Sequence, residues 1–91
     1  MNIATRFGEN LKRCRQRADL SQEELAVRAS LHRTQIGLLE RGSRLPRIDT
    51  LVKLAGALGI PAGELLDGMG WEPGSSTVGD FSIADGDPRS N

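Results

Sequence analysis

Several residue types are scarce in this chain of 91 residues, which has one cysteine, no tyrosine, two phenylalanines and one tryptophan. A single cysteine cannot form an internal disulfide, which suits a reducing compartment. The sequence has no run of 18 apolar residues that could span a membrane, and its N-terminus has no apolar leader of the secretory kind. We therefore expect a cytoplasmic protein with no membrane partner.

The chain is also poor in the side chains that catalysis and metal binding require. His32 is the only histidine, and no second kind of metal ligand clusters near it in the sequence. Ser21 has no histidine in its neighbourhood to act as a base, and the sequence has no phosphate-binding loop. The sequence therefore predicts neither an enzyme nor a site for a cofactor or metal.

The formal net charge is zero, but the two signs are separated along the chain. Residues 1–66 hold 11 Lys/Arg against 7 Asp/Glu, whereas residues 67–91 hold one Arg against 5 Asp/Glu. Between Leu25 and Ile48 there are five arginines and a single acid, Glu40. A basic segment of this kind favours contact with nucleic acid, and the acidic excess is confined to a tail.

Apolar side chains recur at helical spacing through most of the chain. The first stripe consists of Phe7, Leu11, Cys14 and Ala18, at intervals of four, three and four residues. Cys14 on this stripe is expected to be a small buried hydrophobe. The predicted fold is all-α and compact, with five helices over residues 5–18, 21–29, 33–40 (or from His32), 48–58 and 61–66. The fourth of these has a broad apolar face made of Ile48, Leu51, Val52, Leu54, Ala55 and Leu58.

Residues suited to helix ends stand at several of these boundaries. Ser21 and Glu24 have the spacing of a capping box at the start of the second helix. Gly42 suits a left-handed stop after the third helix, and Gly59 followed by Ile60 suits a Schellman ending of the fourth. These signals support the predicted helix boundaries.

The composition changes after residue 67 to Gly, Ser, Asp and Pro. We expect this acidic C-terminal segment, residues 68–91, to be a flexible tail with a possible role in dimerisation. Its only pattern is Phe81 alternating with Ile83, which is a weak strand signal.

The window from Gln22 to Arg41 predicts two short helices that cross closely. Leu25, Ala26 and Ala29 give the first helix an apolar stripe, and Ile36 with Leu39 begins another after a break at residues 30–32. The small Ala26 lets the second helix approach the first. This is the packing of a helix-turn-helix, whose second helix enters the DNA major groove. Residues 1–67 are therefore predicted to form a DNA-binding domain.

The sequence Ser-Gln-Glu-Glu-Leu-Ala at 21–26 and the sequence Ile-Gly-Leu-Leu-Glu-Arg-Gly at 36–42 resemble the Cro/C1-type helix-turn-helix family. This is the xenobiotic-response-element-like class of phage repressors and small bacterial regulators. The likeness extends from Phe7 to Leu66 and includes Pro46. It implies a lambda-repressor-like domain that binds double-stranded DNA and regulates transcription, but it does not indicate which genes.

The resemblance also implies roles for individual residues. Base edges would be met on the third helix by Arg33, Thr34 and Leu38, with Gly37 on the same face. Phosphates would be met by Gln22, His32, Gln35, Arg41, Arg44 and Arg47. Arg15 and Glu40 would form a partly buried ion pair between the first helix and the third. The helical spacing independently predicts an outward face that is short, basic and free of acids.

Some of these positions leave alternatives open. Ser30 stands where the family often has glycine, so a left-handed backbone there would carry some strain. Gly37 either lets the third helix approach the DNA groove closely or means that less of the base sequence is read from this position. Arg47 replaces a common capping serine, and Leu38 could pack against the fourth helix instead of meeting DNA.

The predicted function is sequence-specific regulation, as a repressor in the first instance, by a homodimer on a palindromic operator. The dimer contact would use Leu65, Leu66, Met69 and Trp71, and the segment of Phe81 and Ile83 could pair across the dimer as a short strand. An antitoxin or protein-interaction module, whose acidic tail captures a protein partner, is one alternative. A controller of a restriction–modification system is another, and the sequence does not separate them.

Overall fold

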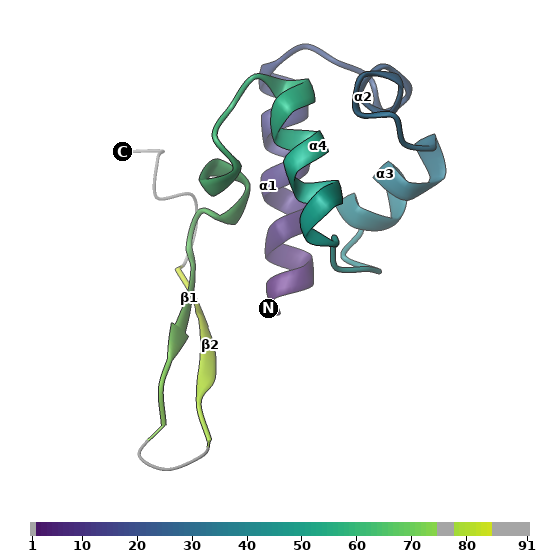
Figure 1. Ribbon diagram of the computed structural model, residues 1–91. Coiled ribbons are helices and arrows are strands. Elements are labelled where there is room, and N and C mark those ends of the chain that lie inside the picture. Colours follow the sequence, from purple (N-terminus) through teal and green to yellow (C-terminus); the bar gives the residue numbers. More distant parts are fainter. Residues whose placement is uncertain (1, 75–77, 85–91) are drawn as a thin grey trace.

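The computed structural model describes residues 2–74 and 78–84 of the chain. Its elements are α1 (Ile3–Arg17), α2 (Gln22–Ala29), α3 (Arg33–Glu40), α4 (Ile48–Leu58), the short 3-10 helix η1 (Ala62–Leu66) and strands β1 (Met69–Glu72) and β2 (Asp80–Ile83). The helices gather around α1, and the two strands project from the bundle on the side away from α2 (Figure 1). In this described part, no helix has the length and apolar content needed to cross a membrane.

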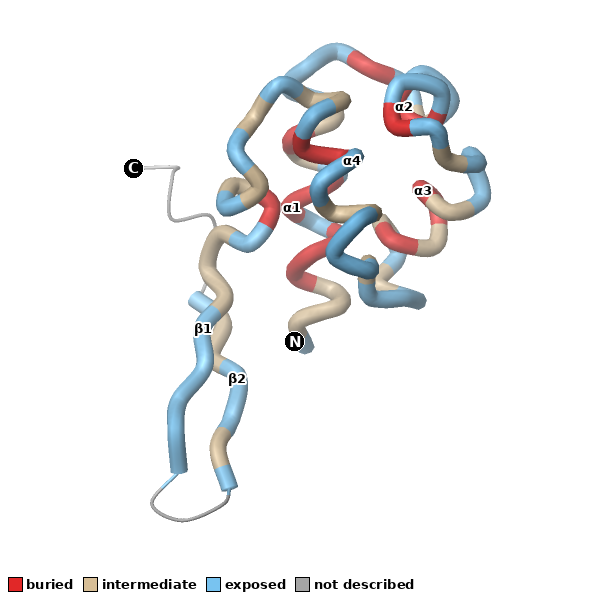
Figure 2. Tube along the Cα trace, in the orientation of Figure 1, coloured by how far each residue is buried: buried red, intermediate tan, exposed pale blue. Residues whose placement is uncertain are grey.

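The core lies where the five helical elements meet. Each contributes at least one side chain that is at most 1% exposed: Phe7, Leu11, Leu25, Ile36, Leu54 and Leu65. Buried stretches recur along α1, α2 and α3 where these helices face the interior (Figure 2). Cys14 is buried as predicted, but Ala18 is exposed because α1 ends at Arg17 and the chain turns away at Asp19, whose φ is 60°.

Helices α1 and α3 touch backbone to backbone at Gly8. A Cβ at this position would lie 2.5 Å from the carbonyl oxygens of both Leu39 and Glu40. No ordinary side chain tolerates so short a contact, so glycine is what permits the two helices to approach this closely. The contact fixes the C-terminal end of α3 against the bundle.

The predicted capping box and the two predicted glycine stops are confirmed. The side chain of Ser21 accepts a hydrogen bond from the backbone N–H of Glu24 at 3.0 Å, and the Glu24 carboxylate accepts one from the N–H of Ser21 at 2.9 Å. Gly42, with a φ of 73°, follows the C-terminal end of α3. Gly59, with a φ of 68°, is the C-cap of α4. The carbonyls left at both ends are satisfied in the Schellman pattern. The N-terminus of α1 is earlier than predicted, because the side chain of Asn2 caps it by accepting from the N–H of Thr5.

Two predictions about the second half of the chain are wrong. The fifth α-helix is instead the 3-10 helix η1, a turn too short to propagate between Pro61 and the left-handed Gly68. The fold is therefore not all-α, because part of the expected flexible tail forms β1 and β2. Only part of the apolar face of α4 is buried. Leu54 and Ala55 are buried, whereas Ile48 and Val52 are 80% and 60% exposed.

Strands β1 and β2 pair in an antiparallel hairpin within one chain. Met69 lies opposite Ile83 and Trp71 opposite Phe81, whose ring centroids are 5.0 Å apart in an edge-to-face arrangement. The segment of Phe81 and Ile83 thus does form a strand, as its weak signal indicated, but this strand pairs with β1 of the same chain. Residues 85–91, which carry the rest of the acidic tail, lie outside the described residues.

Two buried polar side chains of α1 hold the base of this hairpin. Arg6 donates hydrogen bonds to the carbonyls of Asp67 at 3.2 Å and Ala84 at 2.8 Å. Asn10 donates to the carbonyls of Leu65 at 3.1 Å and Asp67 at 3.0 Å. The hairpin is therefore attached to the first helix through backbone carbonyls, whereas the buried Nη2 of Arg6 has no hydrogen-bond partner among residues 2–74 and 78–84.

Candidate nucleic-acid interface

Helices α2 and α3 form the predicted helix-turn-helix. Leu25, Ala26 and Ala29 are buried on α2, and the small Ala26, 3% exposed, lies at the crossing with α3. Ser30 ends α2 in the left-handed region with φ 55°, and Leu31 donates its N–H to the carbonyl of Ala26 at 2.9 Å. The turn therefore has the backbone for which glycine is usual, with serine in its place.

The outward face of α3 holds the residues expected to read bases. Arg33 and Thr34 are exposed in its first turn, and Leu38 is half-buried one turn later. Ile36 and Leu39, 0% and 3% exposed, face the core on the opposite side. The exposed face of this helix thus has a cation, a hydroxyl and a methyl-bearing side chain, which are groups that recognise guanine and thymine in the major groove.

The ion pair predicted between Arg15 and Glu40 is present and bidentate. The Nε of Arg15 lies 2.6 Å from one Glu40 carboxylate oxygen, and its Nη2 lies 3.0 Å from the other. The third nitrogen of Arg15 donates to the carbonyl of Leu20 at 2.8 Å. The hydrogen bond to Glu40 raises the pKa of Arg15 further above its ordinary value, although partial burial opposes this shift. The only acid on α3 is therefore withdrawn from the outward face.

Gln22, expected at a phosphate, is also joined to this pair. Its side-chain amide donates to a Glu40 carboxylate oxygen at 3.1 Å, which ties the start of α2 to the end of α3. The amide group has a second N–H, so this bond orients Gln22 and leaves it one donor for a phosphate. The sequence did not indicate this third member of the network.

His32 and Gln35 are joined to each other at the start of α3. The Oε1 of Gln35 accepts a hydrogen bond from the backbone N–H of His32 at 3.0 Å. His32 is exposed and Gln35 is half-buried. The Gln35 side chain therefore caps its own helix, and its amide N–H groups remain donors at the edge where a phosphate was expected.

The remaining arginines surround the end of α3. Arg41, Arg44 and Arg47 are exposed at the helix end, in the loop and at the N-cap of α4, respectively. Arg47 makes no side-chain cap and lies 3.5 Å from Asp49 in an exposed pair. Exposed pairs of this kind are weak, so the guanidinium is available to another anion.

Comparisons with known proteins agree with this geometry. A family model described as helix-turn-helix matches residues 11–65. Control protein C.BamHI of Bacillus amyloliquefaciens is 40% identical over 67 residues, covering 72% of this chain and 83% of its own length. Control protein C.SmaI of Serratia marcescens is 41% identical over 70 residues, with 77% and 83% covered. The solved restriction–modification controller protein C.AhdI from Aeromonas hydrophila is 40% identical, has a TM-score of 0.67, and matches over 68% of this chain and 94% of its own.

The chain belongs to the Cro/C1-type helix-turn-helix family. It is a DNA-binding transcriptional regulator of that family. The family model ends at residue 65, before β1 and β2 of this Cro/C1-type protein.

The residues predicted for a dimer contact differ in exposure. Leu65 is 0% exposed inside the core, so its side chain offers no surface to a second copy. Leu66 and Trp71 are 43% and 54% exposed, and Met69 is half-buried. Leu66 and Met69 line an apolar groove of about 200 Å³ together with Leu45, Ile48 and other side chains from α1 and α4. Leu45 and Ile48 were not predicted at this surface, although their apolar character beside Pro46 in the loop was visible.

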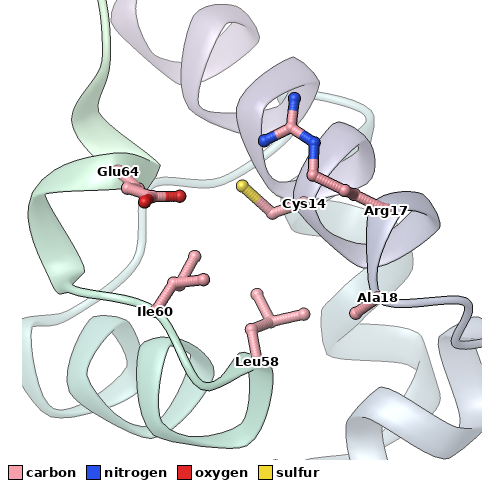
Figure 3. Close-up of a pocket in the computed structure, with 6 residues that line it drawn as sticks. All are labelled: Cys14, Arg17, Ala18, Leu58, Ile60 and Glu64. Atoms are coloured by element: carbon pink, nitrogen blue, oxygen red, sulfur yellow. The ribbon is translucent and has the colours of Figure 1, made fainter.

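A second hollow lies between α1, the end of α4 and η1. The sulfur of Cys14 points toward it, with Leu58, Ile60 and Ala18 as apolar walls and Arg17 and Glu64 at its edges (Figure 3). It lies on other elements than the exposed face of α3. No group of three or more metal-binding side chains occurs among residues 2–74 and 78–84.

Proposed function

We propose that this Cro/C1-type regulator binds as a homodimer to an operator with two-fold symmetry, with repression as its effect. The outward face of α3 carries the proposal: Arg33 and Thr34 are exposed there, and the one acid of the helix is held by Arg15 and Gln22. Arg33 can donate two hydrogen bonds to guanine O6 and N7. Two such helices about 34 Å apart would meet successive major grooves on one side of the duplex.

The phosphate contacts are assigned to the residues around this face. These residues stand in three places along the chain, namely the start of α2, the start of α3 and the loop after α3: Gln22, His32, Gln35, Arg44 and Arg47. Neutralised phosphates release counterions, so these contacts predict binding that weakens as salt rises. They hold the helix in register, whereas Arg33, Thr34 and Leu38 discriminate between bases.

The dimer surface is assigned to the apolar groove lined by Leu45, Ile48, Leu66 and Met69, with Trp71 beside it on β1. These side chains leave apolar area in water in the single chain. Burying such area against a second copy is favourable. The groove is built by elements other than α2 and α3, so a second copy seated there leaves the recognition helix free for DNA.

Selection of bound sequences from a random duplex DNA pool, at two salt concentrations, tests this function. We expect the protein to enrich an inverted repeat, and Arg33→Ala to lose the preference at one position in each half-site. Arg28→Ala, which removes an exposed arginine from α2, serves as the matched control. Binding that depends on salt but enriches no sequence would contradict a base-reading role for α3.

Control of a restriction–modification system is a second, more specific proposal. It is supported by the names of the two control proteins and of the solved controller, each at 40% identity or above. Binding to the DNA upstream of the protein's own gene, with the genes beside it identified, tests this proposal. An operator remote from any restriction or methyltransferase gene would contradict it. Capture of a protein partner by the acidic tail rests on the sequence alone, because residues 85–91 lie outside the described part.

A further inference from the structure

The middle of α3 has a contact between Gly37 and Arg41 that the predicted roles do not use. A Cβ at Gly37 would lie 3.0 Å from Nη1 of Arg41 and 3.8 Å from its Cζ. The guanidinium of Arg41 is therefore folded back along α3 and covers the backbone one turn before its own Cα. Gly37 is buried, although it belongs to the face of Arg33 and Thr34.

The position of Gly37 decides what the folded guanidinium would meet. At 3.6 residues per turn, Gly37 falls between Arg33 and Thr34 when α3 is viewed along its axis. An α-helix, about 10–12 Å across, fills a major groove about 12 Å wide. A group lying on this face is therefore directed at base edges, whereas phosphates line the two rims of the groove.

The guanidinium of Arg41 is also unengaged. It donates no hydrogen bond and forms no ion pair within residues 2–74 and 78–84, and the adjacent Glu40 is held by Arg15 and Gln22. Arg41 is exposed, so its five N–H donors are open to a ligand on the outer side of the helix. A planar fork with free donors matches the paired acceptors O6 and N7 of guanine.

We propose that Arg41 contacts a guanine in the major groove. The missing side chain at Gly37 leaves the space in which the Arg41 guanidinium lies on the exposed face of α3. This assignment replaces the phosphate role expected for Arg41 and rests on the proposed function of α3. Gly37 lies four residues, about 6 Å, beyond Arg33 along the helix, and stacked base pairs are about 3.4 Å apart. Arg33 and Arg41 should therefore specify different positions of one half-site.

Selection from a random duplex pool with Arg41→Ala, Arg41→Lys and Gly37→Ala tests this inference. Arg41→Lys keeps the charge but loses the paired donors, and Gly37→Ala places a methyl group 3.0 Å from Nη1 of Arg41, so that the guanidinium must shift by a few tenths of an ångström. We expect Arg41→Ala and Arg41→Lys to lose, by about 5- to 150-fold, the preference for guanine at the same position of each half-site, and Gly37→Ala to reduce that same preference by a smaller factor. That position should differ from the one that Arg33→Ala affects.

Arg44→Ala is the matched control, since it removes an exposed arginine from the loop without touching the reading face. It should weaken binding to all sequences alike and make the salt dependence shallower by about one unit of slope. If Arg41→Ala behaves like Arg44→Ala and keeps every base preference, the inference is wrong while the proposed function stands. If Gly37→Ala keeps in full the base preference that Arg41→Ala loses, the proposed role of Gly37 in positioning Arg41 is wrong. Failure of the unaltered protein to enrich any motif would reject the proposed function itself.

Discussion

Arg6 and Gly68 are in direct contact, with the guanidinium of Arg6 lying against the Gly68 backbone where a side chain would otherwise be. A Cβ at Gly68 would lie 2.8 Å from the Cζ of Arg6, and Gly68 has a φ of 80°. Arg6 is 3% exposed and bonded to carbonyls on both sides of the hairpin, so it has little freedom to move. Position 68 is therefore closed to other residues for two independent reasons.

Gly68→Ala should lower the free energy of unfolding by about 1–3 kcal/mol, through the positive φ and the collision with Arg6. Urea denaturation measures the change. Gly56→Ala is the matched control, because a Cβ on this exposed turn of α4 would meet nothing within 4 Å. It should raise stability by up to about 1 kcal/mol, the helix propensity difference between glycine and alanine. Equal effects of the two substitutions would contradict the contact.

Glu40→Ala should be among the most destabilising changes at a charged position. Its side chain is 4% exposed and that of Arg15 is 12% exposed, so the substitution leaves a mostly buried cation without its partner. A loss of about 3–5 kcal/mol is expected in urea denaturation. Arg47→Ala breaks an exposed pair with Asp49 and should change stability by less than about 0.5 kcal/mol. A small effect of Glu40→Ala would show that the pair is unimportant to the fold.

The capping box of α2 predicts a dependence of stability on acid. The backbone N–H of Ser21 donates to the Glu24 carboxylate, and this bond lowers the pKa of Glu24 below its ordinary value. Its contribution is therefore present above the unfolded pKa, about 4.3, and lost as the pH falls through the lower folded pKa. The midpoint temperature of thermal unfolding should therefore fall less steeply from pH 5 to pH 3 in Glu24→Gln than in the unaltered protein. Glu23→Gln, at a neighbouring position outside the box, should not reduce that slope to the same extent.

Leu66→Asp should shift the protein toward the monomer if the apolar groove is the dimer surface. The carboxylate would stand at a side chain that is 43% exposed beside Met69 and Ile48. Burying it against a second copy would cost several kcal/mol of association. Sedimentation velocity measures the shift, and Val27→Asp is the control, because Val27 is 75% exposed on α2 and lies outside the groove. An unchanged dimer in Leu66→Asp would place the interface elsewhere.

The helical part of this fold is strongly encoded in local sequence signals. The stripe Phe7, Leu11 and Cys14 and the capping pair Ser21 and Glu24 each act within a few residues, so both could be predicted from spacing alone. Asn10 could also have been recognised, because it falls on the same stripe, three residues after Phe7 and four before Cys14. Its polar side chain is buried because it donates to carbonyls of residues far along the chain.

The hairpin could not be predicted in the same way. Its strands have four residues each, and their pairing depends on Arg6 reaching from α1 to a carbonyl 78 residues later. Likewise, the exposure of Ile48 and Val52 is set by which face of α4 the other helices leave uncovered. Periodicity identifies an apolar face, but only the assembled bundle shows how much of it is buried.

The hydrogen bonds from α1 to the hairpin are accepted by main-chain oxygens of Asp67 and Ala84 at its two ends, and the side chain of Met69 on β1 also packs against the core. Because backbone oxygens accept these hydrogen bonds, the bonds do not depend on which side chains stand at positions 67 and 84. Exposed strand positions such as Glu72 and Asp80 are therefore open to variation, because α1 keeps the same hydrogen bonds to the two ends of the hairpin whatever side chains stand there.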